Sequence, residues 1–141
     1  MASPIDQELD ALAEDFELLG DFEEQIQYMI DLGRTLDPLS EAEHNEANKV
    51  RGCASQVWLV TEPQEGGTVR FRGDSDAHLV KGLIAVLLRL FSGRTPADIL
   101  AFDVRGGIER LGLGSMLTPQ RSNGLASMVQ RIRGDAEALT R

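Results

Sequence analysis

Apolar residues recur every three or four positions through the first 36 residues, in two runs separated by Gly20. The first run follows Ser3-Pro4, a hydroxyl cap and a first-turn proline that are typical of a helix start. The second begins at Asp21, with Glu24 three positions later, and stops at Asp37-Pro38. Each run predicts an amphipathic helix, and we expect the two to pair in antiparallel fashion over the rest of the fold. The expected inner-face positions are Ile5, Leu9, Leu12, Phe16 and Leu19, then Phe22, Ile26, Met29 or Ile30, Gly33 and Leu36.

Strand patterning follows in the middle of the chain. Residues 39–48 are polar and acidic without a period, so we expect a surface connection whose His44 faces solvent and has no role. Lys49–Arg51 is predicted as a brief edge strand, and Ser55–Glu62, rich in β-branched and aromatic residues, as a longer one. After a glycine-containing turn, Thr68–Arg72 alternates apolar and polar side chains. These segments predict a small antiparallel three-stranded sheet with one face exposed to water.

The second half of the chain returns to helical patterning. Leu79–Leu90 is apolar on nearly every side, which is typical of a central buried helix. We expect Asp74 or Ser75 to cap this helix, with Asp76 near the positive end of the helix dipole. Three more helical segments are predicted: Thr95-Pro96 through Leu100, one turn around Ile108–Leu111, and an amphipathic helix from Thr118-Pro119. Residues 1–141 are therefore predicted to form one α+β domain, with the sheet packed against several helices.

Composition and charge narrow the possible functions. The 141 residues carry 23 acids against 14 bases, and this net charge of −9 disfavours nucleic acid as a partner. A single cysteine forms neither an internal disulfide nor a cysteine-rich metal site, and it fits the reducing cytoplasm. The N-terminus lacks the regions of a signal peptide, and the longest apolar stretch is too short and interrupted to span a bilayer. We therefore expect a cytoplasmic protein with no membrane association and no metal or cofactor of its own.

The single cysteine, Cys53, is the strongest candidate for chemistry. It follows Gly52 and lies between the short edge segment and the longer strand, a position typical of a loop tip. A free cysteine is often a small buried hydrophobe, so this residue alone leaves both interpretations open. At a flexible tip, a thiolate can extend far enough to reach a partner protein.

The residues around Cys53 and downstream of it resemble the SufE family. The matching blocks are Gly52-Cys53-x-Ser55-Gln56-Val57-Trp58, Gly73-Asp74-Ser75-Asp76-Ala77, Val80-Lys81-Gly82-Leu83-Ile84-Ala85, Ser92-Gly-x-Thr95-Pro96-x-x-Ile99-Leu100 and Leu117-Thr118-Pro119-x-Arg121-Ser122-x-Gly124-Leu125. The resemblance implies a fold shared with IscU and a sulfur carrier that stimulates a SufS-type cysteine desulfurase, an enzyme that itself uses pyridoxal phosphate. It also implies that Cys53 forms the persulfide and that the sulfur passes to a SufBCD-type scaffold for iron–sulfur cluster assembly.

Three cationic residues are candidates for activating the thiol or contacting the partner. Lys49 and Arg51 precede Cys53 closely in the sequence, and Arg121 lies in a block that matches the family. A nearby cation lowers a thiol pKa and so favours the reactive thiolate. The alternative for each is a surface ion pair, which contributes little.

Five polar residues are predicted to support the cysteine loop. Ser55 and Gln56 follow the cysteine and are expected to bond the loop backbone. The resemblance implies that Asp74, Ser75 and Asp76 lie beside the loop and hold its closed arrangement, by hydrogen bonds to the loop backbone. Helix capping alone would also explain these last three residues.

Two other functions remain as alternatives. The first is an iron–sulfur scaffold resembling IscU, although such a site needs about three cysteines. The second is a thiol hydrolase in which His44 or His78 assists Cys53, although no cysteine–histidine signature surrounds either residue.

Overall fold

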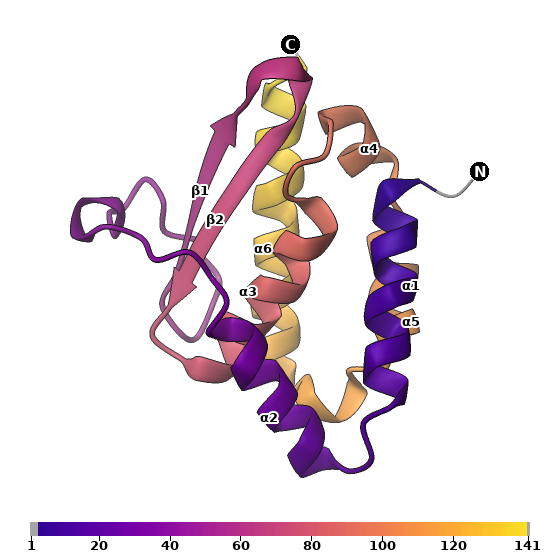
Figure 1. Ribbon diagram of the computed structural model, residues 1–141. Coiled ribbons are helices and arrows are strands. Elements are labelled where there is room, and N and C mark those ends of the chain that lie inside the picture. The colour runs from indigo at the N-terminus through magenta and orange to yellow at the C-terminus, as the bar shows by residue number, and fades with distance from the viewer. Residues whose placement is uncertain (1–2, 141) are drawn as a thin grey trace.

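The computed structural model describes residues 3–140 as a bundle of helices with a small sheet along one side (Figure 1). The helices in this range are α1 (Pro4–Glu17), α2 (Phe22–Gly33), α3 (His78–Phe91), α4 (Pro96–Ala101), α5 (Val104–Leu111) and α6 (Pro119–Ala138). The strands are β1 (Val57–Pro63) and β2 (Val69–Ser75), and short 3₁₀ turns cover Glu41–Glu43, Glu65–Gly67 and Gly114–Met116. Within residues 3–140, no helix is both long and apolar enough to cross a membrane.

Local capping signals place most of the helix starts. The side chains of Ser3, Asp21, Thr95 and Thr118 each accept a hydrogen bond from the backbone N–H three residues further on. These starts are as predicted, because a side-chain cap is decided within four residues. Helix α5 is longer than the single predicted turn, since Asp103 caps it at an earlier residue.

Helix α3 is the centre of the fold, as predicted. Its residues 83–87, 90 and 91 are buried, and the helix packs against α2, β2, α1 and α6. The crossing with α2 is close: a Cβ added to Gly33 would lie 2.7 Å from the Lys81 Cβ. A Cβ added to Gly82 would overlap the backbone carbonyl of Met29. Two glycines therefore let α2 lie directly on α3.

The predicted third strand is wrong. Within residues 3–140 the sheet has two strands, paired antiparallel from Val57 with Ser75 to Pro63 with Val69. Lys49 forms only an isolated bridge with Trp58, because turns on both sides leave one residue free to join the ladder. The fold is therefore α+β with a smaller sheet than the sequence predicts.

The link between β2 and α3 also differs from the prediction. The sequence predicts Asp74 or Ser75 as the helix cap, but β2 runs through Ser75 and α3 begins at His78. Asp74 is paired with Trp58 in the ladder, and the N-cap of α3 is Ala77, which makes no side-chain cap. Ser75 is 3% exposed and its Oγ accepts a hydrogen bond from the Ala77 N–H, so the chain turns into α3 there.

The connection between α2 and β1 is more ordered than its composition indicates. Ser40 and Glu43 form a reciprocal capping box around the first 3₁₀ turn. Glu43 also pairs with Arg72 on β2, and this hydrogen bond lowers the pKa of Glu43 to about 2. The connection thus lies over the polar face of the sheet, which the sequence predicts to be open to water.

Candidate functional site

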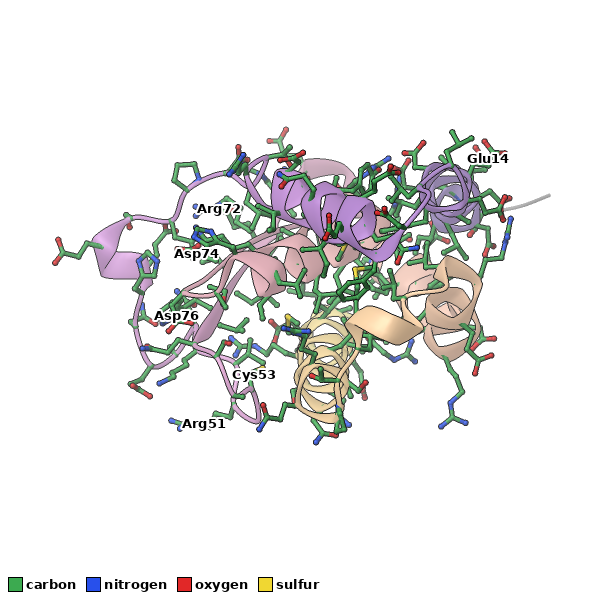
Figure 2. The ribbon with its side chains drawn as sticks, turned by 90° about the horizontal axis from the view of Figure 1, so that it is seen from below. Glu14, Arg51, Cys53, Arg72, Asp74 and Asp76 are labelled. Carbon is green, nitrogen blue, oxygen red and sulfur yellow. The ribbon has the colours of Figure 1, made fainter. Side chains whose placement is uncertain are left out.

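Cys53 lies in an irregular loop between the Lys49 bridge and β1 (Figure 2). Gly52 has a φ of +88°, a value that favours glycine, and a Cβ there would lie 2.5 Å from the Ser127 Oγ on α6. The turn at Gly52 brings the half-buried thiol against α6, where its Sγ lies 3.6 Å from the Gly124 carbonyl oxygen. The thiol therefore rests on a helix while its own segment has no regular structure.

A cavity of about 550 Å³ adjoins the thiol. Val57 and Leu83 contribute to its apolar wall, and Thr118 and Arg121 line it at the start of α6. Concave, largely apolar sites of this size are typical of ligand-binding or reaction sites. This one places apolar side chains beside a sulfur atom added to Cys53.

The thiol is protonated in this arrangement. Burial raises the pKa of Cys53, since an apolar environment disfavours the thiolate. The Sγ–H donates to the Gly124 carbonyl oxygen, and only the neutral thiol has the proton that this contact uses. Activation therefore requires a change in the surroundings of the sulfur atom.

None of the three cationic candidates lowers the pKa of the thiol in this arrangement. Arg51 points outward and pairs with Glu46 at 3.1 Å, with 79% of its side chain exposed. Lys49 lines a separate polar groove with Arg51, and neither residue lines the cavity beside the thiol. Arg121 lines the cavity, but its Nη1 donates to the Met116 carbonyl oxygen at 3.2 Å. Of the three, only Arg121 lies at the cavity.

Two hydrogen bonds join the end of the cysteine loop to the turn before α3. The Gln56 N–H donates to the Asp76 carboxylate at 3.0 Å, and the Asp76 N–H donates to the Gln56 carbonyl oxygen at 3.3 Å. Asp76 therefore makes a side-chain contact with the loop backbone of the kind that the sequence analysis expects. Ser55 lines the cavity, and Ser75 bonds the Ala77 N–H rather than the loop.

His44 has structural contacts that the sequence analysis missed. Its Nε2 lies 2.7 Å from the Asp74 carboxylate and its Nδ1 lies 2.8 Å from the Ser40 carbonyl oxygen, while its ring packs edge-on against Trp58. The hydrogen bond to Asp74 raises the pKa of His44. Burial alone would raise the pKa of Asp74. The hydrogen bonds that Asp74 accepts, of which the one from His44 has the largest effect, and the charge of Lys81 outweigh burial, so the pKa of Asp74 is lowered overall. Asp74 therefore holds the α2–β1 connection, while Asp76 is the residue that bonds the backbone of the cysteine loop.

Arg131 on α6 is a second missed residue near the loop. Its guanidinium donates to the carbonyl oxygens of Ala47, at 2.9 Å, and Lys49, at 3.5 Å. The Asp135 carboxylate accepts from Arg131 at 3.1 Å and from Thr61 on β1 at 2.6 Å, which orients the guanidinium. The base of the cysteine loop is thus fixed to α6 and β1. No local sequence signal marks the contacts of Arg131 with the base of the loop or of Asp135 with Thr61, because they join residues more than 70 positions apart.

Neither alternative function gains support from the site. Among residues 3–140, no group of three or more His, Cys, Asp and Glu side chains is placed to hold a metal ion. His44 contacts Asp74 rather than Cys53, and His78 is exposed at the start of α3. The iron–sulfur scaffold and the histidine-assisted hydrolase therefore have no geometry in their favour.

Comparison with known proteins gives the family. Residues 10–136 match the model of the SufE family, described as an Fe-S metabolism associated domain. An uncharacterised SufE-like protein of Rhizobium etli is 46% identical over 132 residues, covering 92% of this chain and 89% of that protein. A second SufE-like protein, of Rhizobium meliloti, is 42% identical over 132 residues, covering 92% and 94%.

The solution structure of a hypothetical protein from Thermus thermophilus has the same fold. Its TM-score is 0.78 at 23% sequence identity, and the alignment covers 99% of this chain and 98% of the other. The chain belongs to the SufE family, and it therefore has a role in iron–sulfur metabolism. The family resemblance identified from the cysteine block and the downstream motifs is confirmed.

Proposed function

We propose that this chain is a sulfur acceptor that takes persulfide sulfur from a SufS-type cysteine desulfurase onto Cys53 and so stimulates that enzyme. The observation that carries the proposal is the position of the thiol. It lies on a short irregular loop, rests beside an apolar cavity, and is held by a few hydrogen bonds that a partner can replace. A carrier needs such a thiol, because it must reach a donor and then withdraw from oxidants.

The transfer is a thiol–persulfide exchange. Cys53 loses its proton when the loop leaves α6, and the thiolate attacks the terminal sulfur of the donor's persulfide. A bond forms between the Cys53 Sγ and that sulfur, the donor's own S–S bond breaks, and the donor cysteine leaves as a thiolate that takes up a proton. The terminal sulfur moves without an external oxidant or reductant. The product is a persulfide on Cys53, which the apolar cavity shelters when the loop closes.

The second half of the function is delivery. We propose that a SufBCD-type scaffold complex takes the sulfur from Cys53 by the same displacement, with its own thiolate as the attacking group. The chain itself supplies the carrier thiol, while pyridoxal phosphate on the desulfurase supplies the chemistry that releases sulfur from cysteine. We place this exchange in the cytoplasm, where a lone thiol stays reduced between transfers.

Mass spectrometry of the chain after incubation with the desulfurase and cysteine tests the proposal. We expect one additional sulfur atom on Cys53, lost again on treatment with a reducing thiol. Cys53→Ser is the matched control: it should fold normally, gain no sulfur and leave the desulfurase at its basal rate. Equal stimulation by wild type and Cys53→Ser would refute the carrier mechanism.

A further inference from the structure

The acidic residues of the chain are segregated. Residues 1–33 contain ten of the 23 Asp and Glu residues and none of the 14 Lys and Arg residues, the first of which is Arg34. The other 13 acids and all 14 bases lie beyond this point, where they nearly balance. Helices α1 and α2 therefore carry essentially the whole negative charge of the molecule.

The connection between α1 and α2 also exposes apolar surface. Of the large apolar side chains that the structure describes within residues 3–140, three are exposed: Leu18 at 85%, Phe22 at 49% and Leu139 at 41%. Leu18 and Phe22 flank the connection, and the sequence analysis wrongly expects Phe22 on the inner face of its helix. The helix pair does not need them, because Phe16 packs edge-on against Tyr28 just behind the connection.

Leu18 and Phe22 are surrounded in sequence by acids. We call residues 14–24 the acidic tip; its six acids are Glu14, Asp15, Glu17, Asp21, Glu23 and Glu24. Of these, Glu17 makes an ion pair, with Arg110 at 3.8 Å, and within residues 3–140 the other five have no cationic side-chain partner. An exposed apolar pair with an uncompensated acidic border is typical of an interaction surface.

The acidic tip lies at the same end of the molecule as the thiol. Figure 1 places the α1–α2 connection at the end where α6 begins, opposite the C-terminus. Thr118 and Arg121, at the start of α6, line the Cys53 cavity. Figure 2 views the molecule from this end and labels Glu14 and Cys53 on opposite sides of it, so a partner contacts both the cysteine loop and the acidic tip only if it covers the width of this end.

The negative charge of the acidic tip limits which partners can bind there. The tip repels nucleic acid, anionic membranes and the tip of a second copy of this chain. A specific protein interface covers about 800 Å² on each partner, more than one short loop presents. From these observations, and resting on the function proposed above, we infer that Leu18 and Phe22 dock into an apolar recess bordered by Lys and Arg on the sulfur-donating desulfurase.

The apolar part of the contact is tested with matched substitutions at the two ends of the molecule. Leu18→Ser with Phe22→Ser removes the pair at the tip, and Leu139→Ser removes an exposed leucine at the far end. All three positions are exposed, so each variant should fold like wild type, as checked by circular dichroism. We expect the tip variant to raise the half-saturating concentration for desulfurase stimulation about tenfold, with an unchanged maximal rate, and Leu139→Ser to have no effect.

The acidic part is tested through its salt dependence. Glu14→Gln with Glu23→Gln removes two charges at the tip, and Glu65→Gln removes one at the β1–β2 turn. We expect the tip variant to bind the desulfurase on the order of threefold more weakly at low salt and to match wild type at high salt. Glu65→Gln should bind like wild type at both. Measuring binding in a Cys53→Ser background separates docking from sulfur transfer.

The outcomes distinguish this inference from the proposed function. Unchanged half-saturation in the tip variants, an equal effect of Leu139→Ser, or a lower maximal rate alone would each overturn the docking surface. Persulfide formation on Cys53 in those same variants would leave the sulfur-acceptor function intact. If the wild-type chain fails to stimulate the desulfurase at any concentration, the proposed function is wrong, whichever result the tip variants give.

Discussion

The substitution Asp76→Ala tests how the cysteine loop is held closed. The Asp76 carboxylate accepts the Gln56 N–H at 3.0 Å and is exposed to solvent. A hydrogen bond of this kind contributes about 1 kcal/mol net when water competes for it. Its loss should raise the population of the open loop about fivefold, since 1.4 kcal/mol corresponds to a factor of ten.

Alkylation of Cys53 reports that population. The thiol reacts only as an accessible thiolate, and burial raises its pKa in the closed form. We therefore expect iodoacetamide to modify Asp76→Ala about fivefold faster than wild type near neutral pH. The apparent pKa of the thiol should also fall towards its ordinary value of about 8.5 as the burial is relieved.

Two control variants make the result specific. Asp76→Asn retains an oxygen that can accept the Gln56 N–H, so its rate should lie between those of wild type and Asp76→Ala. Glu65→Ala removes an exposed acid at the β1–β2 turn and should react like wild type. An unchanged rate in Asp76→Ala, or the same increase in Glu65→Ala, would show that this bond does not hold the loop.

Three other substitutions test the surroundings of the site. In Gly82→Ala the new methyl group overlaps the backbone carbonyl of Met29. We therefore expect the free energy of unfolding, measured in urea, to fall by about 1–3 kcal/mol. An unaltered urea midpoint would contradict the close packing of α2 on α3. Because Asp74 raises the pKa of His44, the stability from this pair is complete below about pH 6.5 and lost as the pH rises through the raised pKa. The stability difference between wild type and His44→Gln should therefore shrink from pH 6 to pH 8, and a constant difference would refute it. Arg131→Ala frees two carbonyl groups at the base of the cysteine loop, so amide exchange at residues 46–50 should accelerate while the amides of α3 keep their protection; equal acceleration in α3 would indicate general unfolding instead.

The predictable part of this fold is the part decided locally. Four helix starts follow from a side-chain oxygen and an N–H three residues apart, and the buried α3 follows from an apolar run. The predicted cap of α3 is wrong because a local signal was not decisive there. Asp74 and Ser75 have capping side chains but remain in β2. A long-range partner, His44, takes the Asp74 carboxylate and outweighs its local preference.

The candidate site divides in a similar way. Cys53, Gly52 and the neighbouring polar residues could be identified in sequence, because a lone cysteine after a glycine lies within a block that matches a family. The contacts of Arg131 with the base of the loop could not be identified, since they depend on how α6 packs. The protonated resting state of the thiol also depends on packing: it follows from burial against α6, while the nearby cations of the sequence face elsewhere.

The anchors of the cysteine loop limit how deep a donor site can be. The Val50 N–H donates to the Val57 carbonyl oxygen at 2.8 Å, and Gln56 is tied to Asp76, so residues 51–55 are free to extend. Cys53 is three residues from either anchor, and a fully extended chain spans about 3.3–3.6 Å per residue, which gives a radius of about 10 Å. A donor whose persulfide lies deeper than this reach must bring the sulfur outward on a mobile segment of its own. In such an exchange the two proteins would each cover part of the distance, and inserting residues into this tether would widen the choice of donors.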